Sequence, residues 1–142
     1  MKIREATKHD LDEIIDLWKK TSLSIKEKGR DKKSNLQNQL KQPNMWLLLA
    51  EEKSSIIGVV LVTHDTRKGW INRLAVQPDK RRQKIASKLL EEAEKTLLEN
   101  GIQIFAALIE DQNSPSKKFF FSTNYKQHKD ISYFPKRLSD EI

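Results

Sequence analysis

Cysteine is absent from this chain of 142 residues, and histidine occurs only three times. The lack of cysteine excludes disulfides, thiolate metal sites and a cysteine nucleophile. A group-transfer enzyme built on this chain could therefore not pass its cargo through a thiol of its own. The histidines, His9, His64 and His128, share no ligand spacing. We therefore expect no metal enzyme.

Long apolar runs are also missing. No stretch approaches the roughly 20 apolar residues that a membrane-spanning helix needs, and residues 1–5 lack the apolar core of a signal peptide. We therefore expect a cytoplasmic protein with no membrane partner. The length fits one domain over residues 1–142.

The net charge of +7 is concentrated in one segment. Residues 67–88 contain eight basic side chains and one acidic side chain, and the rest of the chain is neutral. Such a local excess predicts an anionic partner, either a nucleotide-like cofactor or a nucleic acid.

The N-terminal third predicts a strand and two helices. Residues 2–6 alternate weakly as in a strand, and Thr7 with Asp10 forms a capping-box pattern at the start of a helix. That helix places its apolar residues on one face: Leu11, Ile14, Ile15 and Trp18. Residues 21–34 predict a loop or frayed helix, and a weaker second helix must end before Pro43.

Three strands are expected in the middle of the chain. Residues 45–51 and 56–63 predict a β-hairpin across a polar turn, and residues 70–76 predict the next strand. The run Ile57–Val62 is too continuously apolar for a strand with one wet face, so we expect that strand to be central.

A long amphipathic helix follows the basic segment 80–84 and ends at Asn100-Gly101. Its charges are reversed relative to the helix dipole. Three basic residues crowd its start and four acidic residues lie further on: Arg81, Arg82, Lys84, Glu91, Glu92, Glu94 and Glu99. A polyanion bound at the helix start would remove the conflict, and a solvated basic helix start is the alternative.

The last third completes a βαβ unit. Residues 102–109 are apolar apart from Gln103 and predict a buried strand parallel to residues 70–76. Ser114-Pro115 begins a short helix that runs through Ser122, and Asn124 is suited to a left-handed conformation at its end. Tyr125 and residues 131–134 are expected to supply closing strands.

Three segments carry a family pattern. Residues 71–78 read Ile-Asn-Arg-Leu-Ala-Val-Gln-Pro, residues 81–86 read Arg-Arg-Gln-Lys-Ile-Ala, and the third segment contains Asn113, Ser116, Phe120, Asn124 and Tyr125. With them, nearly the whole chain resembles the Gcn5-related N-acetyltransferase (GNAT) family. The ending Lys136-Arg137-Leu138 is similar to that of small single-domain bacterial and archaeal members.

The resemblance implies an α/β (α+β) fold with a mixed, largely antiparallel central sheet, a splayed parallel βαβ pair and helices on both faces. It implies an N-acetyltransferase that uses acetyl-CoA as co-substrate and no metal. The residues that it implies for cofactor binding are Leu74, Ala75, Val76, Arg81, Arg82, Gln83, Lys84, Ile85, Ala86, Asn113 and Phe120.

Two positions depart from the family pattern. Lys84 replaces a glycine, so its Cβ leaves less room for close backbone approach, while its ammonium can pair with phosphate. Phe120 replaces the tyrosine that in many relatives protonates the leaving thiolate, and such assistance is typically worth about 10²–10⁴-fold. We expect Phe119 or Phe121 to pack in the core.

The general base stays open. Asn72 has no carboxylate and could only orient a water molecule. Glu110, Asp111 and His64 are the candidate bases, although residues at strand ends are more often simply solvated.

Other functions also stay open. A catalytically weak or inactive coenzyme A-binding sensor or partner domain is the alternative to an enzyme. A nucleic-acid-binding domain is disfavoured, because no aromatic platform is interleaved with the basic residues. The acceptor amine, whether a protein N-terminus, a lysine or a small molecule, is not determined, and neither is the oligomeric state, a homodimer included.

Overall fold

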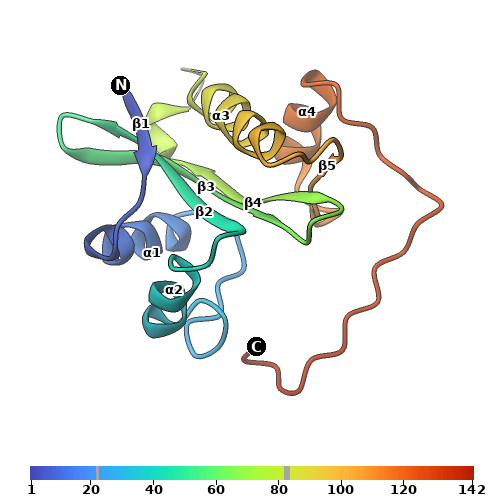
Figure 1. Ribbon diagram of the computed structural model, residues 1–142, viewed down its shortest axis with the longest axis horizontal. Helices are drawn as coiled ribbons and strands as arrows, with labels where there is room; N and C mark the ends of the chain where they lie inside the picture. The colour runs from blue at the N-terminus through green and yellow to red at the C-terminus, as the bar shows by residue number, and fades with distance from the viewer. Residues whose placement is uncertain (22, 82–83) are drawn as a thin grey trace.

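A five-stranded sheet forms the centre of the part of the chain that the structure describes, residues 1–21, 23–81 and 84–142 of a computed structural model (Figure 1). The strands, in their order across the sheet, are β1 (Lys2–Glu5), β2 (Met45–Glu52), β3 (Ser55–His64), β4 (Gly69–Val76) and β5 (Phe105–Ala106). Strands β1 to β4 pair in antiparallel fashion, and β5 pairs with β4 in parallel. The predicted mixed, largely antiparallel sheet is confirmed.

Helices cover both faces of this sheet (Figure 1). They are η1 (Lys8–Asp10), α1 (Leu11–Lys19), α2 (Lys33–Gln39), η2 (Pro78–Lys80), α3 (Ile85–Glu99) and α4 (Ser114–Ser122). One apolar cluster lies between the sheet and α1 with α2, and the other lies between the sheet and α3 with α4. None of the described helices is long and apolar enough to cross a membrane.

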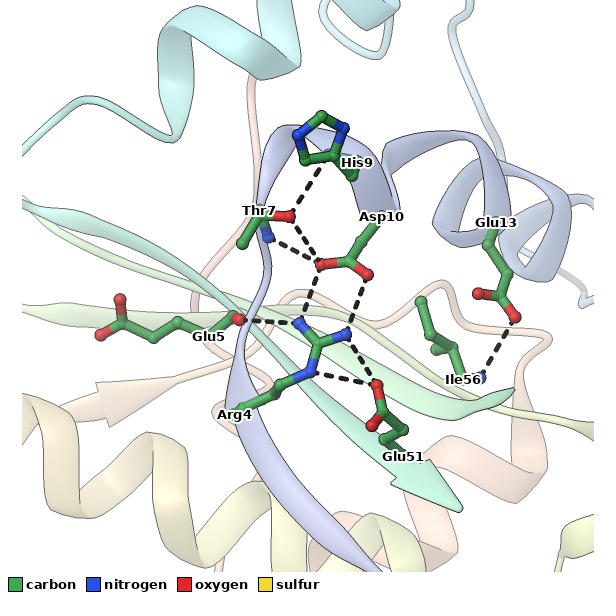
Figure 2. A network of polar contacts seen from close by, with 8 residues as sticks. All are labelled: Arg4, Glu5, Thr7, His9, Asp10, Glu13, Glu51 and Ile56. Atoms are coloured by element: carbon green, nitrogen blue, oxygen red, sulfur yellow. Dashed lines mark hydrogen bonds and ion pairs between the residues drawn. The ribbon is translucent and has the colours of Figure 1, made fainter. Parts of the chain in front are cut away.

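The first helical segment is capped as predicted. The Thr7 side chain accepts a hydrogen bond from the backbone of His9, and the Asp10 carboxylate accepts one from the Thr7 backbone (Figure 2). Arg4 of β1 donates to both Asp10 oxygens at 2.9 Å and also pairs with Glu51 of β2 at 2.7 Å. The Arg4 guanidinium lowers the pKa of Asp10 to about 2 and joins β1, β2 and η1.

Strand β3 is central, as its continuous apolar run predicts. Residues Ile56–Val60 are all buried, and the strand pairs with β2 on one side and β4 on the other. At Gly58 the sheet lies very close to α3, because a Cβ there would stand 2.9 Å from side-chain atoms of both Ile85 and Leu89. The missing side chain therefore lets the first turn of α3 pack directly on the sheet.

Two predictions for the C-terminal third are wrong. Only Phe105–Ala106 of the segment 102–109 forms a strand, and Ile104 and Leu108 are more than half exposed. The predicted closing strands at Tyr125 and residues 131–134 do not form. The two errors have one cause: residues 126–142 run away from the sheet (Figure 1), so β5 lacks the outer neighbour that would cover it.

Candidate functional site

Strands β4 and β5 separate soon after they begin, and a cavity opens between them. The parallel pairing joins Gly69 with Phe105 and Trp70 with Ala106, and it goes no further. Beyond Trp70, the backbone of β4 that faces β5 has no strand partner among the described residues. A cavity of about 660 Å³ begins there and is lined by β4, by the segment that follows β5 and by α4.

Arg73 lies at a bulge of β4 in the wall of this cavity. Arg73 and Leu74 together oppose Val60 of β3, and Arg73 has a φ of 51°. This positive φ is uncommon for a residue with a side chain. The bulge turns the Arg73 side chain toward α1 and the loop after it, where the guanidinium lies 5.2 Å from the ring centre of Trp18.

Asp31 holds Arg73 in a nearly buried ion pair. Their closest N–O distance is 2.7 Å, and the side chains of Arg73 and Asp31 are only 11% and 4% exposed. The same carboxylate accepts a hydrogen bond from the Lys26 backbone, and Arg73 donates to the Ser24 carbonyl. Burial lowers the pKa of Arg73, while the Asp31 charge opposes this shift. The pair therefore ties the loop between α1 and α2 to β4.

Sequence reasoning missed this pair. Arg73 is the one charged residue among residues 69–76, and this is the signal that could have singled it out. Asp31 gives no comparable signal, because it lies within a polar, lysine-rich segment 42 positions away.

The three candidate bases lie in different surroundings. Glu110 lines the cavity, where one carboxylate oxygen accepts from the Ser24 hydroxyl at 3.3 Å and the other from Gln112 at 2.7 Å. Asp111 is exposed and paired with Lys117 at 2.6 Å. His64 stacks on Trp46, and its Nδ1 accepts from the Thr66 backbone. Glu110 is thus the one of the three that lines the cavity.

Helix α4 places two further predicted residues at the cavity wall. Asn113 caps the helix by accepting from the Ser116 backbone, and it lines the cavity. Phe120 lines the cavity too and is otherwise buried, with ring-edge contacts to Phe119 and Tyr125. The expected burial of a neighbouring phenylalanine applies to Phe119, which packs partly on the core, because Phe121 is 52% exposed.

The residues predicted on β4 are divided between cavity and core. Leu74 lines the cavity together with Asn72. Ala75 is buried and Val76 is partly buried against the core, and neither residue lines either of the two cavities.

The start of α3 adopts the backbone conformation that glycine favours. Lys84 caps the helix with a φ of 61° and a ψ of 20°, which is the left-handed region. Ile85 is buried against the sheet, Ala86 is partly buried and Arg81 is exposed. The predicted residues Arg82 and Gln83 lie outside the described residues.

Several of the basic side chains in residues 67–88 already have partners within the protein. Lys80 pairs with Glu52 at 2.9 Å, and Arg73 pairs with Asp31. Lys68 lies 5.8 Å from the ring centre of Trp70. Among the described residues at the start of α3, Arg81 and Lys84 are exposed.

A second cavity, of about 970 Å³, lies beside the first. Its walls are the residues of and around β5, the end of α4, and residues 126–128 and 131–133 of the C-terminal segment. Six residues line both cavities: Asn72, Ala107, Leu108, Ile109, Phe120 and Tyr133.

Comparisons with known proteins agree on one family. The model of the acetyltransferase (GNAT) family matches residues 11–122. A curated relative, acetyltransferase plu1384 of Photorhabdus laumondii, is 26% identical over 139 residues, which is 97% of this chain and 96% of the relative.

Two solved structures share the fold. The aminoglycoside 6'-N-acetyltransferase AAC(6')-Ig of Acinetobacter haemolyticus superposes with a TM-score of 0.80 at 21% identity, over 98% of this chain and 100% of that one. The PaiA N-acetyltransferase of Thermoplasma acidophilum, solved with coenzyme A, gives a TM-score of 0.79 at 23% identity over 88% of this chain and 89% of that one.

Proposed function

This chain belongs to the acetyltransferase (GNAT) family, and from that premise we propose that residues 1–142 form a single domain that transfers an acetyl group from acetyl-CoA directly to a primary amine. The observation that carries the proposal is the early separation of β4 and β5, which leaves a free backbone edge at the wall of a cavity. A β-strand edge binds an extended amide chain through backbone hydrogen bonds. The pantetheine arm of acetyl-CoA is such a chain.

Residues along this strand edge are suited to the pantetheine arm of acetyl-CoA, and the start of α3 is suited to its pyrophosphate. The backbone of Leu74, Ala75 and Val76 would bind the pantetheine amides, together with the Asn113 side chain at the opposite wall. The start of α3 would bind the pyrophosphate, because the first N–H groups of a helix lack intrahelical acceptors and carry partial positive charge. The left-handed Lys84 adds a full charge at this end of the helix.

Glu110 is our candidate for the general base. In the proposed step the amine nitrogen attacks the thioester carbonyl, the C–N bond forms and the C–S bond breaks. The amine proton passes to the Glu110 carboxylate, and the electron pair leaves with the coenzyme A thiolate. Phe120 has no proton to give, so water protonates the thiolate.

The charges around the cavity bear on the acceptor. Its ionised lining residues are Arg30, Asp31, Arg73, Glu110 and Arg137. The ion pair between Arg73 and Asp31 neutralises two of these charges, and two arginines and one glutamate then remain. Such a lining disfavours an acceptor with several positive charges. We therefore favour a primary amine without further cationic groups, such as a peptide N-terminus, over a polycationic aminoglycoside.

Two measurements test the proposal in sequence. Acetyl-CoA at about 100 times its dissociation constant should raise the free energy of unfolding by about 2.7 kcal/mol, which a thermal-shift titration detects. Release of free thiol is then measured with a panel of peptide N-termini, lysine derivatives, aminoglycosides and small amines. No thermal shift would contradict acetyl-CoA binding altogether.

The base is tested with a matched pair of variants. Glu110→Gln should lower thiol release by about 10²-fold, the low end of the usual contribution of a general base. Asp111→Asn, one residue away but outside the cavity, should leave the rate unchanged. A thermal shift without thiol release for any amine would favour the alternative, a coenzyme A-binding sensor. Phe120, which cannot protonate the leaving thiolate, also points to that alternative.

A further inference from the structure

Two arginines of the first cavity have no role in the proposed reaction so far. Arg30 and Arg137, which we call the arginine pair, line the cavity of about 660 Å³ and are both exposed. Arg73 in the same lining is already paired with Asp31, whereas neither member of the arginine pair forms an ion pair with a described residue. Arg137 donates one hydrogen bond, to the Ile142 main-chain oxygen. The cavity therefore holds two guanidinium groups that are able to bind an anion.

Two distant segments bring the arginine pair into one lining. Arg30 lies in the loop between α1 and α2, where its carbonyl accepts a hydrogen bond from the Gln39 side chain at 3.0 Å. Arg137 lies just before the last residues of the chain, which rest on the same loop (Figure 1). This contact depends on Gly29, because a Cβ there would overlap the Glu141 carbonyl oxygen. Backbone packing around the loop therefore positions both arginines, and a ligand in the cavity can contact both.

Asp31 does not neutralise Arg30, although the two are neighbours in the sequence. The Asp31 carboxylate accepts from Arg73 and from the Lys26 backbone, both at 2.7 Å. Burial lowers the pKa of Arg73, the Asp31 charge opposes this shift and the Arg30 charge adds to it. Arg30 therefore adds positive charge to the side of the cavity where Arg73 lies.

The rest of the lining limits what the ligand can be. It is largely apolar and includes Leu23, Met45, Leu61 and Ile109. Glu110, our candidate base, belongs to the same lining, so the reacting amine must reach its carboxylate. A molecule that fills this cavity beside acetyl-CoA must therefore combine an amine, an apolar part and an anionic group.

We propose that the acceptor is a small amino acid with an apolar side chain, and that the arginine pair binds its carboxylate. The proposal rests on the proposed function and adds the class of the acceptor to it. The planar guanidinium of arginine matches a carboxylate with two parallel hydrogen bonds, and lysine, which lacks this geometry, is absent from the described lining. A carboxylate is favoured over a phosphate, because the cost of moving an anion out of water rises with its charge.

The carboxylate takes no part in the bond changes. The amine nitrogen forms the C–N bond with the acetyl group, the C–S bond breaks, the amine proton passes to Glu110 and the electron pair leaves with the coenzyme A thiolate. The product is an N-acetyl amino acid that keeps its carboxylate. The arginine pair should therefore bind the product as well as the substrate.

Binding of this product tests the arginine pair without turnover. Isothermal titration calorimetry, with coenzyme A present, compares N-acetyl-leucine with its amide, which lacks the negative charge. The acid should bind the wild type at least about tenfold more tightly than the amide. This preference should disappear when Arg30→Met and Arg137→Met are combined. Circular dichroism of this double variant should be unchanged, because both residues are exposed.

Arg67→Met is the matched control for the double variant. Arg67 is exposed in the turn between β3 and β4 and lines neither cavity, so this variant should keep the preference for the acid. Equal binding of acid and amide by the wild type, binding of neither, or a preference that survives the double variant would overturn the proposal.

Turnover distinguishes a failure of this proposal from a failure of acetyl transfer itself. Thiol release is measured with leucine, methionine, phenylalanine and their amides. The ratio of kcat/KM between acid and amide should fall about tenfold in the double variant and stay constant in Arg67→Met. The intrinsic reactivities of the two amines cancel, because the same ratio is compared between proteins.

The possible results of the turnover assay lead to different conclusions. Thiol release with an unchanged ratio would refute the role of the arginine pair and leave acetyl transfer intact. A larger effect of the double variant on the aminophosphonate analogue of leucine than on leucine would refute the choice of a carboxylate. No thiol release from any amine would refute the proposed function, and the acceptor class with it.

Discussion

Replacing Asp31 by asparagine should destabilise the protein strongly, although Asp31 is a loop residue. Its side chain is 4% exposed and accepts two hydrogen bonds of 2.7 Å, from Arg73 and from the Lys26 backbone. Removing one partner of a buried ion pair typically costs about 3–5 kcal/mol, because the other charge stays buried without compensation. Asparagine keeps an acceptor for the Lys26 N–H, so we expect the lower end, about 3 kcal/mol.

Urea denaturation of the wild type and the Asp31→Asn variant measures this loss as a lower midpoint at an unchanged slope. For a chain of this size the same loss corresponds to a decrease in Tm of about 10 °C. Asp12→Asn is the matched control, because Asp12 pairs with Lys33 at 3.0 Å but its side chain is 76% exposed. An exposed pair of this kind is worth about 0–1 kcal/mol.

A double-mutant cycle with Arg73→Met separates the ion pair from other roles of Asp31. If the pair carries the effect, the double variant should lose much less than the sum of the two single losses, with a coupling energy of about 2 kcal/mol. A loss below about 1 kcal/mol for Asp31→Asn, or coupling near zero, would refute the assignment of the pair as the tie between the loop and β4.

Three further predictions concern single side chains. Asp10→Asn should lower the free energy of unfolding by about 2 kcal/mol at pH 7, because Arg4 lowers the pKa of Asp10 to about 2. The urea midpoints of wild type and variant should converge as the pH falls from about 4 to about 2. An equal difference in midpoint at both pH values would contradict the pairing. Lys84→Gly should stabilise the protein by about 1 kcal/mol, since it relieves a left-handed φ of 61°. Lys88→Gly, inside the same helix, should destabilise it by about 1 kcal/mol. A change in stability of the same sign for both variants would exclude strain at Lys84. Phe120→Tyr should raise thiol release by roughly 10²-fold if an acid is missing from the site, and an unchanged rate would show that thiolate protonation does not limit the reaction.

Local patterns predicted most of the elements and failed where a distant partner decides the outcome. The capping box at Thr7, the central β3 and the left-handed Asn124 follow from neighbouring residues, and the structure has all three. The pairing of Arg73 with Asp31 depends on a bulge and on a contact across 42 positions, and neither leaves a periodic signal.

The segment after α4 shows the same limit. Ile131, Tyr133 and Phe134 suit a strand, but a strand also needs an edge to pair with, and the segment after α4 runs away from the sheet (Figure 1). Propensity alone cannot say which edge a strand will meet, because the choice depends on tertiary context. The prediction of closing strands is therefore wrong, although the side chains of this segment suit a strand.

The close approach at Gly58 has a consequence for engineering the site. Gly58 lies on β3, outside the linings of both cavities, yet its missing side chain lets α3 rest on the sheet. A Cβ there would come within 2.9 Å of side-chain atoms of Ile85 and Leu89, so these side chains at the end of α3 that we assign to the pyrophosphate would have to move. A mutant library confined to residues that face the ligand would omit this position. Directed evolution of the preference for the acyl donor should therefore include position 58, where a change in packing can alter the proposed binding site without touching the ligand.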